Sequence, residues 1–110
     1  MIKVKMETVN KTYAQLLREK SENCQKDIIN KYVEKAVKNA LLAMNDAAYK
    51  GHCNIVYYTT DHLPLFGESV ICSKIKEELI VKGFNEISVK PCRDYHSSRN
   101  NIVVEIIIAW

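Results

Sequence analysis

The first half of the chain carries apolar residues at the three- and four-residue spacing of amphipathic helices. A short stripe comprises Val9, Tyr13, Leu16 and Leu17. A longer stripe comprises Ile28, Ile29, Tyr32, Val33, Ala36, Val37, Ala40, Leu41, Met44, Ala47 and Ala48. Gly51 follows the second stripe and is a typical helix stop.

A polar run over residues 18–27 interrupts this pattern. It predicts two helices with a joint near residues 21–25. The alternative is one long helix whose first half projects and packs against a partner. In both cases residues 1–28 form an amphipathic N-terminal helical segment, and residues 29–110 form an α-β-α-β-β core.

The second half alternates between strand and helix patterns. We expect a strand over residues 54–60, a helix over residues 68–82 that ends at Gly83, a strand over residues 85–90, and a last strand from residue 102. Pro91 either ends the strand over residues 85–90 or places that strand at a sheet edge. The prediction is an α+β fold: an N-terminal helix or helix pair, followed by β-α-β-β with a small three-stranded mixed sheet.

The last strand, "IVVEIIIAW", is apolar on nearly every residue. Apolar side chains on both faces are typical of a central strand that is covered on both sides. A domain of this size needs helices on both faces or a second subunit to provide that cover. We therefore expect the C-terminal strand to be central and the protein to be a homo-oligomer, a dimer or higher.

The 110 residues predict a single domain, and a net charge of +3 is lower than phosphate-binding modules usually carry. The sequence shows neither a membrane-spanning run nor a signal peptide, so we expect a cytoplasmic protein that does not associate with membranes. Its four cysteines are then reduced thiols, and their wide spacing does not suggest a metal site.

The clearest concentration of polar chemistry lies in the loop 91–100 and at the end of the first strand. Arg offers forked donors to phosphate, whereas Tyr and His can stack on a base. The ends of two parallel strands would bring these segments together. The candidate ligand-binding residues are Tyr58, Thr60, His62, Arg93, Tyr95, His96 and Arg99. The alternative is a solvated loop that keeps an exposed edge soluble.

Lys31, Lys35 and Lys38 form one stripe on the second helical segment and are candidates for nucleic-acid binding. An exposed lysine stripe is also common on a merely solvated helix face. No phosphate-binding glycine loop, nucleophile motif or paired carboxylates stand out, so we expect neither an enzyme nor a cofactor.

The run "AAYKG", the Lys-Gly-Phe that follows the second helix and the terminal Trp resemble a pattern of short phage-encoded proteins. The matching residues, within about residues 29–110, are Ala47, Ala48, Lys50, Gly51, Lys82, Gly83, Phe84 and Trp110. This resemblance implies a phage or viral origin and action in a host cytoplasm. The first hypothesis is a non-catalytic binding protein, such as a host-defence inhibitor that sequesters a nucleotide-type anionic ligand. The alternatives are a module that docks on a host protein through its N-terminal helices, and a weak nucleic-acid-binding protein.

Overall fold

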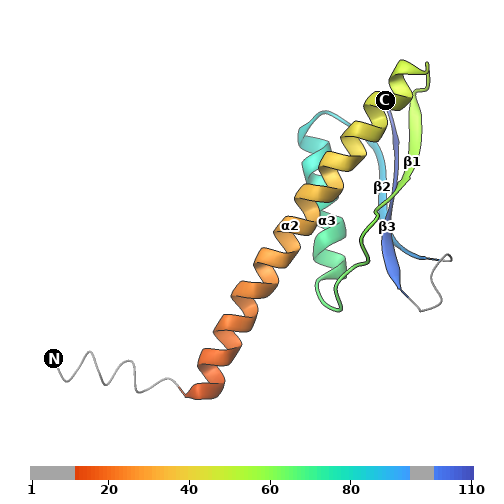
Figure 1. Cartoon of the computed structure of the whole chain (residues 1–110). Coiled ribbons are helices and arrows are strands. Elements are labelled where there is room, and N and C mark those ends of the chain that lie inside the picture. Colours follow the sequence, from red (N-terminus) through yellow and green to blue (C-terminus); the bar gives the residue numbers. More distant parts are fainter. Residues whose placement is uncertain (1–11, 95–100) are drawn as a thin grey trace.

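Five elements make up the described part of the chain, residues 12–94 and 101–110 of a computed structural model. They are α2 (Tyr13–Tyr49), β1 (Asn54–Tyr58), α3 (Glu68–Val81), β2 (Glu86–Arg93) and β3 (Ile102–Ala109). Figure 1 shows the two helices beside a single three-stranded sheet, so the predicted α+β class is confirmed.

α2 is one uninterrupted helix, so the predicted joint near residues 21–25 is wrong. Thr12 begins the helix with a capping box, in which its hydroxyl accepts from the Gln15 N–H and the Gln15 side chain accepts from the Thr12 N–H. Residues 18–27 contain no Gly or Pro, and most of them favour helix. Gly51, at φ +85°, provides the left-handed stop after the last turn. The alternative of one long helix with a projecting first half is the arrangement found.

The sheet is antiparallel throughout, so the predicted mixed sheet is also wrong. β1 and β2 run in the same direction, as a strand–helix–strand unit requires, but β3 lies between them and pairs with both. β3 is the most apolar strand, and the central position buries the most apolar surface. Pro91 lies opposite Val104 in the edge strand β2, where a residue without an N–H is tolerated.

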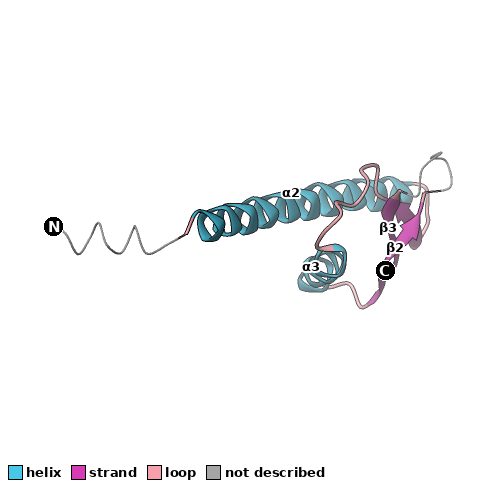
Figure 2. Ribbon diagram, turned by 90° about the horizontal axis from the view of Figure 1, so that it is seen from below, coloured by secondary structure: helices cyan, strands magenta, loops and turns pink. Residues whose placement is uncertain are grey.

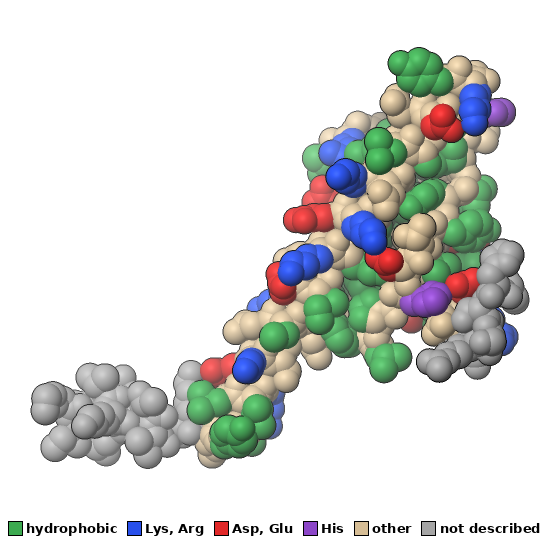
Figure 3. Space-filling view, in the orientation of Figure 1, with side chains coloured by type: hydrophobic (Ala, Val, Ile, Leu, Met, Phe, Trp, Pro, Cys, Tyr) green, Lys and Arg blue, Asp and Glu red, His purple; other side chains and the backbone are tan. Residues whose placement is uncertain are grey.

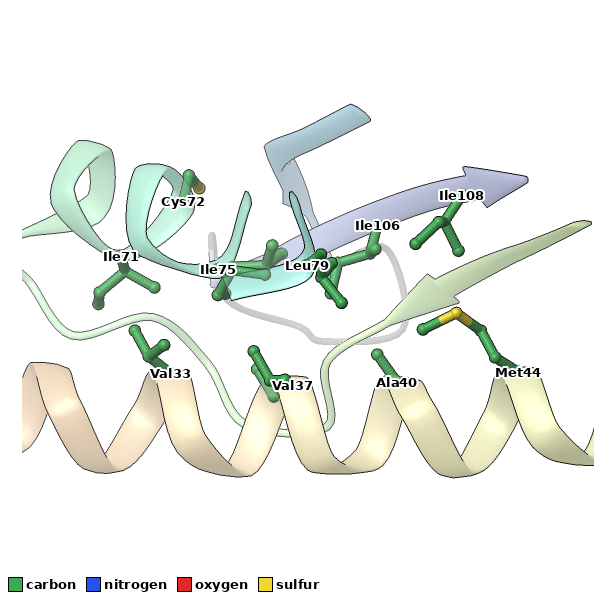
Figure 4. Close-up of a cluster of buried hydrophobic side chains, with 12 residues drawn as sticks. Val33, Val37, Ala40, Met44, Ile71, Cys72, Ile75, Leu79, Ile106 and Ile108 are labelled. Carbon is green, nitrogen blue, oxygen red and sulfur yellow. The ribbon is translucent and has the colours of Figure 1, made fainter. Parts of the chain in front are cut away.

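The core lies between the two helices and one face of the sheet (Figure 4). Val104, Ile106 and Ile108 of β3 are fully buried there. The helices contribute Val33, Ala36, Val37, Ala40 and Met44 from α2, and Ile71, Cys72, Ile75 and Leu79 from α3. The two alanines let α2 approach the sheet closely.

No element among the described residues covers the other face of the sheet, because both helices lie on the same side (Figure 2). Ile107 is 39% exposed on that face and Val56 is 56% exposed, although Val103 is buried. The prediction that both faces of the last strand are covered is therefore wrong for a single chain. A three-stranded sheet is about 14 Å wide and a helix about 10 Å, so one face already requires both helices.

Candidate functional site

The polar edge of the sheet lies where β1 and β2 end. Because these strands share a direction, their ends lie at the same edge, on either side of β3. Beyond β1 the chain continues along β3, with the Leu63 N–H donating to the Ile102 carbonyl at 2.7 Å. The His62 Nε2 atom then lies 2.9 Å from Asp94 Oδ2, just after β2. This contact is a hydrogen bond that becomes an ion pair when His62 is protonated.

Two of the predicted ligand-binding residues, Tyr58 and Arg93, lie on opposite faces of the sheet. Tyr58 pairs with Glu105 on the open face of the sheet, whereas Arg93 pairs with Ile102 on the helix-covered face. Thr60 is exposed in the loop that follows β1. Three further candidates, Tyr95, His96 and Arg99, lie outside the described residues.

A hollow of about 270 Å³ lies beside Arg93 at the start of α3. Its lining residues are Glu68, Pro91, Cys92, Arg93 and Ile102. Glu68 lines the same hollow, so an anion there would approach one carboxylate as well as the Arg93 guanidinium. The hollow is therefore lined by both a positive and a negative side chain.

A hydrogen-bond network centred on Thr59 joins this edge to α2. The Tyr32 hydroxyl donates to the Asp61 carbonyl at 2.6 Å and lies 2.7 Å from the Thr59 hydroxyl. Thr59 Oγ1 also accepts from the Val104 N–H of β3 at 2.9 Å. Lys35 completes the network with a 2.7 Å ion pair to the Asp61 carboxylate.

Both hydroxyl protons of this network have an acceptor if the Thr59 hydroxyl donates to the Tyr32 oxygen and the Tyr32 hydroxyl donates to the Asp61 carbonyl. Burial raises the pKa of Tyr32 above its ordinary value of 10.0, and the Asp61 carboxylate raises it further, against the Thr59 hydrogen bond. Thr59 is a polar residue that is buried, since only 7% of its surface is exposed. The network holds the loop that carries His62, and the sequence offered no spacing signal for it.

Tyr58 belongs to a second polar group on the open face. Its hydroxyl donates to Glu105 Oε2 at 3.1 Å, and Lys90 Nζ lies 3.4 Å from Glu105 Oε1. The hydrogen bond to Glu105 raises the pKa of Tyr58, because that bond and the adjacent negative charge both favour the neutral phenol. The group accounts for the one acidic residue in the middle of the apolar strand β3.

The lysine stripe predicted for nucleic-acid binding is largely engaged with acidic side chains. Lys31 Nζ lies 3.1 Å from Asp27 Oδ2 within α2, and Lys35 pairs with Asp61. Lys38 lines an open groove of about 760 Å³ between α2 and α3, which also contains Glu34 and Glu78. These pairs reduce the positive potential that phosphate binding would require.

The first half of α2 is a continuous exposed surface. Every residue from Thr12 to Ile28 is exposed, and Figure 2 shows this half extending beyond α3 and the sheet. Tyr13, Leu16 and Leu17 expose 77%, 45% and 47% of their surfaces. Side chains of this kind are usually buried, so this cluster is a candidate interaction surface.

Three comparisons, with protein families, curated proteins and solved structures, found no match to this chain. Across residues 12–94 and 101–110, no group of three or more His, Cys, Asp or Glu side chains could hold a metal ion. Within the same ranges, no helix combines the length and apolarity that crossing a bilayer would require.

Proposed function

We propose that the protein is a non-catalytic interaction protein that presents the projecting half of α2 to a protein partner. The observation that carries this proposal is the exposed apolar cluster of Tyr13, Leu16 and Leu17 on a helix that leaves its own domain. In Figure 3 the cluster forms a hydrophobic patch at the free end of α2.

The energetics of an isolated helix support the same proposal. Residues 13–28 gain no stabilisation from tertiary burial, and helices of about 12–15 residues are marginal in water on their own. Such a segment gains its stability from its continuity with the packed half and from whatever covers its apolar side. A helix laid in a partner's groove through anchors at i, i+3 and i+4 is a common mode of protein recognition, and Tyr13, Leu16 and Leu17 have that spacing.

The test compares two variants of the full chain that change the net charge equally. L16E/L17E places two acidic residues in the apolar cluster, and glutamate keeps the helix propensity high. The matched control, Q25E/K26Q, makes the same change in charge on the other side of the helix. Binding is measured by light scattering of the purified protein and by affinity capture from a bacterial lysate.

We expect L16E/L17E to lose the partner that the wild type and the control retain. Identical behaviour of all three proteins in both assays would refute the proposal. Circular dichroism checks that each variant remains folded, which we expect because these side chains are exposed.

A second candidate function, binding of a nucleotide-type anion, rests on the position of the β1 and β2 ends at the same edge and on the hollow beside Arg93. The Glu68 carboxylate, which lines the same hollow, opposes it electrostatically. A thermal-shift screen with nucleotides and cyclic dinucleotides tests this candidate, and R93Q should abolish any shift that arises there. A role against host defence, suggested by the resemblance to phage-encoded proteins, is compatible with either surface.

A further inference from the structure

We infer that the partner of the projecting helix is a second copy of this chain, which pairs with α2 in the antiparallel direction. This inference rests on the proposed function and names its partner. It starts from the placement of exposed apolar side chains along the whole of α2, not only at its free end.

The exposed large apolar residues of α2 all lie on one stripe. They are Tyr13, Leu16, Leu17, Ile28, Leu42 and Tyr49, with exposures between 45% and 87%. At 3.6 residues per turn, each residue advances about 100° around the axis, which places all six within a sector of about 120°. The buried residues of α2, from Val33 to Ala47, occupy the opposite sector. The stripe therefore faces away from the sheet and is sterically open.

The stripe is apolar at its two ends and charged in between. Tyr13, Leu16 and Leu17 form one end, and Leu42 and Tyr49 form the other, about ten turns from Tyr13. Figure 3 shows hydrophobic side chains towards both ends of α2 and a mixture of basic and acidic ones in the middle. Neither end has a partner of matching character within residues 12–94 and 101–110, because a straight helix keeps its ends apart.

Two copies related by a two-fold axis near Lys31 bring the free end of each helix against the distal end of the other. In this arrangement Lys31 lies opposite its own copy at the axis, and Asp27 of one copy lies opposite Lys35 of the second on both sides of it, so two pairs of opposite charges flank one pair of like charges. A parallel pair would instead align all three lysines, Lys31, Lys35 and Lys38, with the same residues of the second copy and would form no pair of opposite charges between them. Charge complementarity therefore selects the antiparallel orientation.

The size of the contact sets the expected strength. A helix of 37 residues is about 55 Å long, and a strip about 10 Å wide gives a footprint of roughly 550 Å² per copy. A standard stable interface buries about 800 Å² per partner. We therefore expect a reversible dimer whose population rises with protein concentration.

The experiment uses sedimentation analysis of the full chain with two charge variants at the opposite ends of the stripe. Leu17→Glu and Leu42→Lys should each weaken self-association at least about tenfold, since each change occurs twice per dimer. Each dimer has two equivalent contacts, in which position 17 of one copy lies within one turn of position 42 of the other. Mixing the two variants should restore dimerisation, because one of these contacts then pairs Glu with Lys and the other keeps both leucines. The Leu17→Glu/Leu42→Lys double variant should recover as well. V81E is the control, since Val81 is 82% exposed on α3 and off the stripe.

Several outcomes would overturn the inference. A wild type that remains monomeric at about 1 mM excludes the dimer. A dimer that both single variants leave intact, but that Ile107→Lys disrupts, uses the open face of the sheet instead. Single variants that weaken the dimer without rescue on mixing indicate a parallel pair. If the wild type is monomeric while L16E/L17E still loses a captured protein, the inference fails and the proposed function stands.

Discussion

Replacing Thr59 by Val tests whether its hydroxyl is the joint between the β1 end, α2 and β3. Thr and Val have nearly the same shape and the same preference for extended backbone, so the substitution removes the hydroxyl and little else. In the folded protein Thr59 is only 7% exposed, and water cannot readily replace the lost group.

The expected cost follows from the contacts. The Val104 N–H, 2.9 Å from Thr59 Oγ1, would be left buried without an acceptor, which costs about 1–3 kcal/mol. Loss of the 2.7 Å hydrogen bond to Tyr32 adds about 1 kcal/mol. Thr59→Val should therefore lower the free energy of unfolding by about 2–4 kcal/mol.

Urea denaturation followed by circular dichroism measures this change, with Thr59→Ser and Tyr32→Phe as controls. Thr59→Ser keeps the hydroxyl and should cost only about 1 kcal/mol for its methyl group. Tyr32→Phe should cost a similar amount, because the Thr59 hydroxyl still accepts from Val104 and can donate to the Asp61 carbonyl at 3.3 Å. If Thr59→Val and Thr59→Ser agree within about 0.5 kcal/mol, the hydroxyl does not have the role assigned to it.

The remaining predictions concern the covered face, a helix start and alkaline pH. Ile106→Ala should lower the free energy of unfolding by about 2–5 kcal/mol in denaturant titrations, because Ile106 is fully buried. Ile107→Ala, measured at low protein concentration, should lower it clearly less. Equal losses for the two variants would contradict a sheet that is covered on one side. Gly67→Ala should lower the melting temperature by the equivalent of about 1–3 kcal/mol, because Gly67 has φ +72° and the new Cβ would lie 2.7 Å from Ile29 Cδ1. Burial raises the pKa of Tyr32, so the folded state holds the phenol proton more tightly than the unfolded chain does. Stability should therefore fall as pH rises above 10.0, and Tyr32→Phe should weaken that fall in titrations at several alkaline pH values.

Local structure was predictable because its signals are local. The helix over Glu68–Val81 follows a three-and-four spacing and ends before Gly83, which has φ +100°. Strand β2 lies at an edge, which is one of the two positions that Pro91 allowed. The alternation of Ile87 and Val89 correctly placed both on one face. Each of these features depends on residues close together in the chain.

The central position of the last strand was predicted from its apolar sequence and is confirmed, but the separation of β1 from β2 and the antiparallel direction of every pair were not predictable in the same way. A strand–helix–strand unit normally gives two adjacent parallel strands, and nothing in residues 54–90 indicates that a later strand will separate them. The insertion of β3 depends on the apolar surface of the whole molecule, since Val104, Ile106 and Ile108 gain most from the central position. The Thr59 network is similarly hidden, because its partners Tyr32 and Val104 lie far away in the sequence.

The continuity of α2, which the sequence analysis did not favour, changes the functional interpretation of its first half. If the helix broke near residues 21–25, a turn could rotate the stripe of Tyr13, Leu16 and Leu17 back towards the sheet, and these residues would belong to the core. In a continuous helix the advance of about 100° per residue instead places them opposite Ala40, which is fully buried. The decisive signal was the absence of Gly and Pro from residue 12 to residue 50, since without a residue that stops the helix a polar run need not end it. Continuity therefore turns the same apolar residues from core positions into an exposed surface.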